Sequence, residues 1–219
     1  MNILITRTVR PESDFVTLLS AKGHRVHGES LISFAPVEPG EVPRVEWLFF
    51  YSKTSVRFFF EQIDLGKIKD VRLAAIGQGT ADFLERTYHQ PEFVGTGDPF
   101  DTATAFLAVA RGSQVLFPRA MDSRRTIQQL LGDKITAHDM VVYKNLARTD
   151  FDLPEFDCLV FTSPLNAQAY FSKRQFWPHQ KVVAIGSTTA SALAEFGVKK
   201  VTLADLPSEK SLALAVLNI

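Results

Sequence analysis

Short runs of consecutive apolar residues recur along the chain, separated by longer segments with helical spacing. The runs span residues 3–5, 47–51, 73–76, 115–117, 158–161 and 182–185. Because they are continuous rather than alternating, they predict strands that are buried on both faces of a parallel sheet. The alternation of such strands with helices predicts an α/β fold.

Capping residues mark the places where helices are expected to begin. Ser163 and Pro164 are typical of the N-cap and the first position of a helix, and residues 11–23 carry proline near the start and glycine at the end. Further helices are expected to start at Ser123, at Asp101, at Thr188 or Thr189, and at Ser208. Helices at these places would connect successive parallel strands.

Two stretches interrupt the alternation. Residues 31–40 contain two prolines and a glycine, and residues 135–144 form a longer extended run that ends at Tyr143. Linkers between domains favour such compositions, so both stretches are predicted to be domain crossings.

The two halves of the chain resemble each other. Arg7 and Arg119 follow similar apolar runs. Phe50 and Phe161 lie near the ends of two other similar runs, and Gly77 matches Gly186 within similar turns. Each pair is spaced by about 110 residues, which indicates a duplicated α/β unit of small-domain size. The alternative explanation is the general similarity that strand–turn–helix segments of any α/β protein show to one another.

Composition narrows the class of protein. The 219 residues include 24 Lys+Arg and 24 Asp+Glu, and 46% of them are hydrophobic. That mix is ordinary for globular proteins, and a nucleic-acid-binding surface would usually show a basic excess. The chain shows neither a signal peptide nor an apolar run of about 18 residues, so we expect a soluble, cytoplasmic protein with no membrane partner.

Metal and disulfide chemistry find little support. Cys158 is the single cysteine, which removes an intrachain disulfide or a cysteine-cluster metal site. The histidines show no ligand spacing beyond His24 and His27, so no metal site is predicted. Gly77 and Gly79 lack the third glycine of the dinucleotide-binding fingerprint.

Polar turns that join a strand to a helix are the strongest candidates for chemistry. Such turns leave backbone N–H groups free at the carboxyl ends of the strands, where anions bind and where open α/β sheets hold ligands. Each turn alone is explained by helix capping, whereas together they suit a ligand with several carboxylates or phosphates. The four turns are Ser52-Lys53-Thr54-Ser55, Gly77-Gln78-Gly79-Thr80, Thr162-Ser163-Pro164-Leu165-Asn166 and Gly186-Ser187-Thr188-Thr189.

Five further side chains could add to such a site. Arg7 and Arg119 follow equivalent strands and could each pair with a ligand carboxylate, or else form surface ion pairs. Arg124 and Arg125 near a helix start oppose the helix dipole, which hints at an anion nearby. Tyr143 could donate a proton, although a packing role is the alternative.

These features resemble the uroporphyrinogen-III synthase family over essentially the whole chain. The resemblance rests on Leu4-Ile5-Thr6-Arg7, Val142-Tyr143, Val160-Phe161-Thr162-Ser163-Pro164 and Ala184-Ile185-Gly186-Ser187-Thr188-Thr189-Ala190, in that order. Ser187 stands where the family often has proline, and Tyr51-Ser52-Lys53-Thr54 replaces a more usual F-T-S turn.

The resemblance implies two flavodoxin-like parallel-sheet domains joined by a two-stranded linker. Residues 1–34 with 147–219 would form a discontinuous first domain, and residues 38–140 the second. Residues 35–37 and 141–146 would be the linkers. The sequence repeat and the spatial domains would then be different units.

The resemblance also implies a reaction and a site. The family converts hydroxymethylbilane into uroporphyrinogen III, with loss of water and inversion of ring D and without a metal or organic cofactor. By position, Tyr143 is the residue expected to assist departure of the hydroxide. The residues expected to bind substrate are Arg7, Ser52, Ser55, Gly79, Thr80, Arg119, Thr162, Ser163, Gly186, Ser187, Thr188 and Thr189.

Two other functions stay open at this point. A two-lobed anion-binding protein would share hinged α/β lobes, although an export signal would be expected for a periplasmic one. A synthase-like domain that binds tetrapyrrole without activity would share every motif. A monomer is the default expectation, since no apolar helix demands a partner.

Overall fold

The computed structural model describes residues 1–68 and 70–219, which divide into two compact units. Unit 1 comprises Met1–Ser33 and Leu146–Ile219, and unit 2 comprises Phe34–Asn145. The strands β3 (Ile32–Pro36) and β8 (Thr136–Ala147) carry the chain across this division. Unit 2 is therefore an insertion within the sequence of unit 1.

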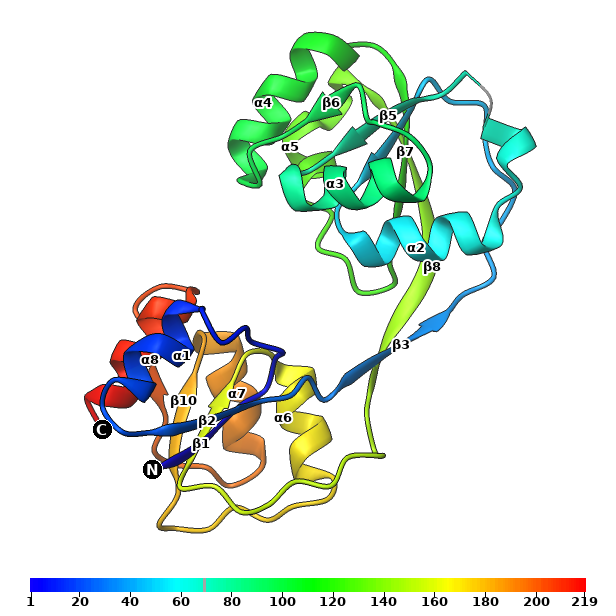
Figure 1. Cartoon of the computed structure of the whole chain (residues 1–219). Helices are drawn as coiled ribbons and strands as arrows, with labels where there is room; N and C mark the ends of the chain where they lie inside the picture. Colours follow the sequence, from blue (N-terminus) through cyan, green and yellow to red (C-terminus); the bar gives the residue numbers. More distant parts are fainter. Residues whose placement is uncertain (69) are drawn as a thin grey trace. The chain divides into compact units, whose positions relative to one another are not determined.

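Unit 1 is a five-stranded sheet covered by helices on both faces. The sheet order is β11-β10-β9-β1-β2 and every neighbouring pair is parallel. Figure 1 shows α1 and α8 on one face and α6 and α7 on the other. The elements are β1 (Asn2–Ile5), α1 (Asp14–Ser20), β2 (Arg25–Gly28), β9 (Cys158–Phe161), α6 (Pro164–Phe171), β10 (Lys181–Ala184), α7 (Ser187–Glu195), β11 (Thr202–Leu203) and α8 (Glu209–Leu217).

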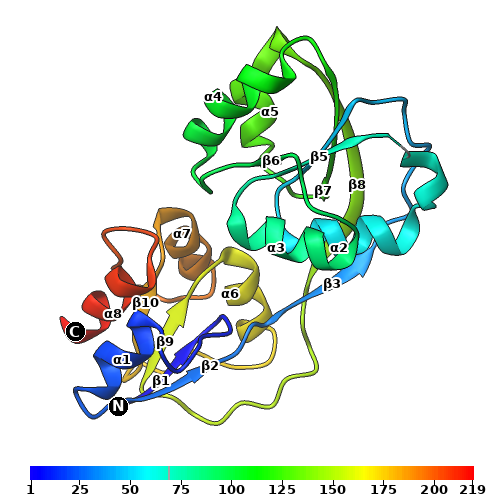
Figure 2. The same ribbon diagram turned by 45° about the horizontal axis from the view of Figure 1, so that its top comes forward.

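Unit 2 repeats this arrangement with one added strand. Its sheet order is β3-β8-β7-β4-β5-β6, in which β8, β7, β4, β5 and β6 are parallel. Helices α2 and α3 cover one face and α4 and α5 the other (Figure 2). The elements are β4 (Trp47–Phe50), α2 (Lys53–Gln62), the 3-10 helix η1 (Leu65–Ile68), β5 (Arg72–Ala75), α3 (Gln78–Thr87), β6 (Phe93–Val94), α4 (Pro99–Ala110), β7 (Gln114–Ala120), α5 (Thr126–Leu131) and the 3-10 helix η2 (Gly132–Lys134).

The two sheets share one strand order once the matching strands are paired. In unit 1, the spatial order β2-β1-β9-β10-β11 reads 2-1-3-4-5 in chain order, which is the flavodoxin-like arrangement. In unit 2, β8-β7-β4-β5-β6 occupies the same places, with β7 and β8 later in the chain. The expected α/β fold with parallel sheets is confirmed.

The cores follow from the continuous apolar runs. Strands β4 and β9 are buried at every position, so each presents side chains to helices on both faces of its sheet. Phe58 and Phe59 of α2 are buried against β4, as expected of a core-facing helix. No helix within residues 1–68 and 70–219 is long and apolar enough to cross a membrane.

Some helix starts differ from the expectation. Ser163 and Ser208 cap α6 and α8 as predicted. The prediction for Ser123 was wrong, because α5 begins at Thr126 after Arg125 adopts a left-handed φ of 54°. The prediction for Asp101 was also wrong, because Asp98 accepts N–H bonds from Phe100 and Asp101 and starts α4 earlier.

Candidate functional site

The turn between β4 and α2 places Ser52 and Ser55 at the carboxyl edge of the unit 2 sheet. Ser55 N donates to Ser52 Oγ at 3.1 Å, and Ser52 N donates to Ser55 Oγ at 3.2 Å, which is a capping box. Ser55 is buried, so its hydroxyl serves the fold. The N–H groups of Lys53 and Thr54 have no acceptor in the described part of the chain and stay available to an anion.

Helix α3 begins beside α2, and a lysine lies near its first turn. Its N-cap is Gly77, which supplies no side-chain cap, while Thr80 N donates to Gly77 O. A Cβ placed on Gly79 would lie 3.8 Å from Lys53 Nζ, so the ammonium group lies beside Gly79. A cation next to two helix N-termini opposes both dipoles unless an anion binds there.

Lys53 is therefore a candidate functional residue, although the sequence had not placed it among the expected substrate-binding residues. The available signal was its position, because lysine at the first residue of a helix is unfavourable on electrostatic grounds.

Tyr143 lies in β8 at the level where β4 and β7 end. It pairs with Ala120 of β7, stacks on Phe58 at a centroid distance of 5.3 Å and meets Phe34 edge-on. It is 8% exposed, and burial raises its pKa, while the nearby Ser52 side chain acts against that rise. The structure thus brings the predicted proton donor beside the predicted binding turn at Ser52.

Arg119 is held by contacts within unit 2. Its Nε donates to Asp139 Oδ1 at 2.7 Å, and its Nη1 donates to the carbonyls of Ala120 and Met121. Gln128 Nε2 donates to the same Asp139 oxygen at 2.8 Å, and Tyr51 OH donates to Gln128 Oε1. The guanidinium therefore fixes the loop after β7, and its predicted contact with substrate would compete with these bonds.

Asp139 is the centre of this network, and it carried no signal in the sequence. Arg125 reaches its second oxygen at 3.4 Å. Burial acts to raise the pKa of Asp139, but hydrogen bonds from Arg119, Gln128 and Arg125 outweigh burial and lower the pKa below its usual value. The residue is thus ionised at neutral pH.

In unit 1, the turn between β9 and α6 is held from two sides. Thr162 Oγ1 donates to Thr6 O at 2.8 Å, and Thr162 N donates to Thr6 Oγ1. Ser163 Oγ accepts from Asn166 N at 3.2 Å and from Asn166 Nδ2 at 2.9 Å. The hydroxyls of Thr162 and Ser163 are therefore engaged in hydrogen bonds that stabilise the turn. The Leu165 N–H has no acceptor among the described residues.

Helix α7 starts next to α6, because β9 and β10 are neighbours. Its N-cap is Gly186, which offers no side-chain cap, and Thr189 N donates to Gly186 O. Ser187 and Thr188 are exposed, whereas Thr189 is 3% exposed and faces the core. Ser187 and Thr188 are therefore the better placed of the predicted residues in this turn.

Arg7 follows β1 at the same edge of the unit 1 sheet. Its Nη2 lies 3.8 Å from Glu209 Oε1, and both side chains are partly exposed. Such a pair contributes little to stability and can exchange for another carboxylate. The role of Arg7 in binding stays a prediction.

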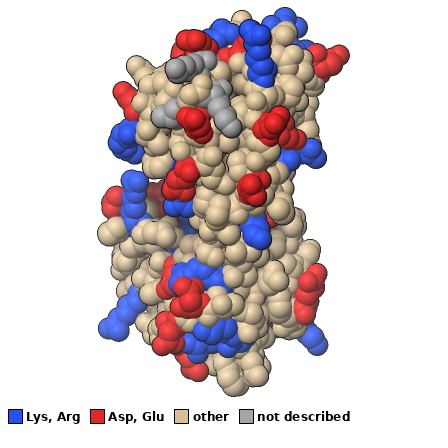
Figure 3. All heavy atoms as spheres, turned by 90° about the vertical axis from the view of Figure 1, so that its right-hand side faces the viewer, with Lys and Arg blue, Asp and Glu red and all other residues tan. Residues whose placement is uncertain are grey.

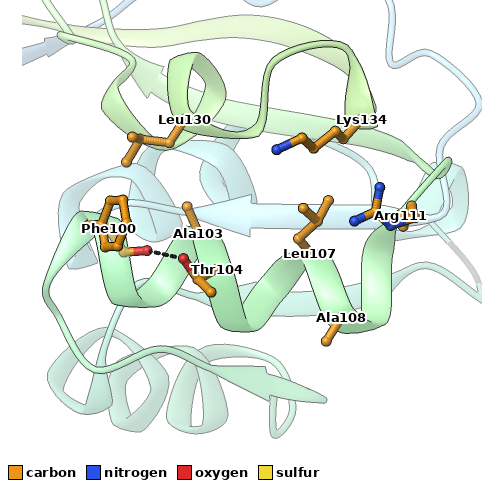
Figure 4. Close-up of a pocket in the computed structure, with 8 residues that line it drawn as sticks. All are labelled: Phe100, Ala103, Thr104, Leu107, Ala108, Arg111, Leu130 and Lys134. Atoms are coloured by element: carbon orange, nitrogen blue, oxygen red, sulfur yellow. Dashed lines mark hydrogen bonds between the residues drawn. The ribbon is translucent and has the colours of Figure 1, made fainter.

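A cavity in unit 2 lies away from the predicted site residues. It measures about 520 Å³ and lies between α4 and α5 (Figure 4). It is lined by apolar side chains at one end and by Arg111 and Lys134 at the other. None of the predicted site residues is among its lining residues.

Charges of both signs are mixed on one face of the molecule. On the face drawn in Figure 3, Lys and Arg side chains are interspersed with Asp and Glu. Anion binding at the sheet edges must then come from local N–H groups and single cations. Within the ranges that the structure describes, no three His, Cys, Asp or Glu side chains gather as metal ligands would.

Three comparisons with known proteins point to one family. The family model described as uroporphyrinogen-III synthase HemD matches residues 13–213. A uroporphyrinogen-III synthase from Chlorobaculum parvum is 27% identical over an alignment of 223 residues, and the match covers 90% of this chain and 90% of that protein. The crystal structure of uroporphyrinogen-III synthetase from Helicobacter pylori has a TM-score of 0.69 at 22% identity, covers 99% of this chain and 98% of its own, and supports the fold.

Proposed function

The chain belongs to the uroporphyrinogen-III synthase family, and from that premise we propose that it binds the carboxylates of hydroxymethylbilane at the carboxyl edges of its sheets. Members of this family are cyclising lyases of haem biosynthesis, and the reaction forms uroporphyrinogen III. The observation that carries the residue assignment is the position of Tyr143, which stacks on Phe58 of α2 and lies near Ser52, where that helix begins.

The substrate needs many weak anion contacts rather than one strong one. Every pyrrole of hydroxymethylbilane carries an acetate and a propionate, so the molecule is a flexible polyanion. In unit 2, the N–H groups of Lys53, Thr54 and Gly79 and the Lys53 ammonium are suited to these carboxylates. In unit 1, the N–H groups and hydroxyls of Ser187 and Thr188 are suited in the same way.

Tyr143 is the group proposed to assist the first step. The hydroxymethyl group must leave as hydroxide, with a proton supplied to give water, and the chain becomes an electrophile. A phenol with a raised pKa is fully protonated at neutral pH, so it can donate a hydrogen bond to the departing oxygen. Because that raised pKa disfavours full proton loss, hydrogen bonding rather than complete transfer is its expected contribution.

The remaining steps depend on how the substrate is folded. The electrophile is attacked at the substituted carbon of ring D, the resulting spiro intermediate fragments, and re-closure leaves ring D inverted. Because the open chain closes spontaneously to isomer I, the enzyme must favour one site of attack over another. Contacts along the acetate and propionate arms would supply that selection.

A coupled chemical assay tests the function directly. Freshly prepared hydroxymethylbilane is added to the protein, the products are oxidised, and isomers I and III are separated by chromatography. We expect isomer III well above the protein-free control. Isomer I alone, at the spontaneous rate, would show a tetrapyrrole-binding chain without synthase activity.

The proposal includes three further properties: the first two are expected from the sequence, and the third is implied by the family resemblance. The enzyme would act as a monomer, in the cytoplasm, without a metal or organic cofactor. Sedimentation at working concentration and activity after dialysis against a chelator would test the first and the last.

A further inference from the structure

We propose that a small cavity behind the loop that follows β7 binds one acetate or propionate arm of the substrate, with Arg124 pairing to its carboxylate. This inference rests on the proposed function, since it takes its ligand from that reaction. It assigns a role to Arg124, which helix capping leaves unexplained.

The cavity lies at the carboxyl edge of the unit 2 sheet. Tyr51 follows β4, Ile76 follows β5 and Pro99 begins α4 after β6, while residues 123–127 follow β7. Residues from the segments that follow four strands therefore meet around one space. This is the edge at which α2 and α3 also begin, as expected of a ligand-binding edge in an α/β sheet.

The size of the cavity matches one arm of the substrate. Its volume is about 140 Å³. At about 30 Å³ for each water-sized group, it holds roughly four or five non-hydrogen atoms, the content of an acetate or propionate arm. Ile76 and Ile127 offer apolar walls to the methylene groups, and Ser123 and Thr126 offer hydroxyls to the carboxylate.

Arg124 is the cation that remains for a ligand. Arg119 and Arg125 both pair with Asp139, at 2.7 and 3.4 Å. Arg124 is exposed and makes no ion pair or side-chain hydrogen bond with any residue that the structure describes. Asp122 of the same loop is exposed and does not line the cavity.

The loop is held in place before any ligand arrives. Arg119 Nη1 donates to Ala120 O at 3.0 Å and to Met121 O at 3.2 Å. Ser123 N donates to Ala120 O, and Arg125 N donates to Ser123 Oγ. A loop fixed in this way loses little conformational entropy when the carboxylate binds.

The test compares Arg124→Gln with the control Arg86→Gln. Arg86 is exposed in the last turn of α3, at the opposite end of that helix from Gly79. We expect KM for hydroxymethylbilane to rise about tenfold in Arg124→Gln, the loss of one charge-assisted contact in a partly exposed site, with kcat within about twofold. Arg124→Lys should recover part of the loss. Arg86→Gln should match the wild type.

A second readout separates this inference from the synthase activity. Uroporphyrin III, the oxidised form of the product, carries the same arms and can be titrated by fluorescence. Its Kd should rise about tenfold in Arg124→Gln at unchanged melting temperature, whether or not the wild type forms isomer III. Kd and KM equal to those of Arg86→Gln would overturn the arm site, as would a fall in kcat with KM unchanged.

Discussion

At the scale of single residues, the hydroxyl groups of the candidate site serve folding before binding. Ser52 and Ser163 accept N–H bonds from the third residue of their helices, and Ser55 and Thr189 are buried. What remains open to a carboxylate is the backbone N–H groups of the first turn. The residue types that mark an anion site in the sequence are thus mainly those that shape it.

Tyr143→Phe tests whether the phenol assists the reaction. We expect the rate of isomer III formation to fall by about tenfold to a hundredfold, because a hydrogen bond to the departing oxygen is lost while substrate binding is kept. The initial rate with fresh hydroxymethylbilane measures this. Tyr88→Phe is the matched control, since Tyr88 ends α3 away from Ser52. An unchanged rate at unchanged stability would remove Tyr143 from the mechanism.

Asp139→Asn tests the network behind the loop after β7. The pKa of Asp139 is lowered in the fold, so its contribution to stability is full above the ordinary value of 3.8 and is lost as the pH falls through the lowered pKa. We expect the free energy of unfolding to drop by about 1–2 kcal/mol at neutral pH, since the side chain is partly exposed. The gap to the wild type should narrow as the pH falls from about 4 through the lowered pKa.

Urea unfolding at several pH values provides the measurement for Asp139→Asn. Asp152→Asn is the control, because Asp152 pairs with Arg174 at 3.5 Å but is fully exposed, and we expect no change there. A constant gap between Asp139→Asn and the wild type down to pH 3 would mean that lost packing, not lost charge, is responsible.

At the scale of elements, the sequence predicted the interior strands well and the edges poorly. Continuous apolar runs marked β1, β4, β5, β7, β9 and β10, since strands buried on both faces carry little else. The short edge strands β6 and β11 have two residues each and leave no periodic pattern. The start of α5 escaped prediction because Arg125 takes a left-handed conformation that favours glycine or asparagine.

The candidate site shows the same division. The turns at Ser52, Gly77, Ser163 and Gly186 were found because small polar residues follow buried strands. The network around Asp139 was not, because it joins residues from β7, β8 and α5 whose proximity depends on the strand order. Long-range neighbours of this kind have no local signature.

Ser163→Ala and Ser208→Ala separate capping from binding at the level of the helix. Each serine caps its helix through an N–H···Oγ bond of 3.2 Å to the third helical residue. Both variants should lose about 1 kcal/mol of stability. Only Ser163→Ala should also raise KM for hydroxymethylbilane, because Ser163 is one of the predicted substrate-binding residues and Ser208 is not. Equal KM values in the two variants would assign Ser163 to folding alone.

At the scale of the whole molecule, the repeat in sequence and the units in space differ. The halves of the sequence pair at about 110 residues, yet unit 2 draws β7 and β8 from the second half and unit 1 draws β1 and β2 from the first. The balanced net charge of the chain likewise says nothing about the local charge at the sheet edges, where Lys53 and Arg124 are the cations proposed to bind substrate carboxylates.

Two fragments test which units fold. Residues 34–145 contain the whole of both apolar clusters of unit 2, so we expect this fragment to show a cooperative thermal transition by circular dichroism. A fragment of residues 1–110, cut at the repeat, lacks β7, β8 and β9 and should not. Cooperative unfolding of the second fragment, or its absence in the first, would contradict this division.

The insertion of unit 2 has a consequence for synthesis on the ribosome. Strand β1 lies between β2 and β9 in its sheet, and β9 is made only after all of Phe34–Asn145. At about 5–20 residues per second, the apolar side chains of Ile3, Leu4 and Ile5 wait on the order of ten seconds for that neighbour. Unit 2 can complete its own sheet meanwhile, so residues 1–33, which are made before unit 2, complete their sheet after it.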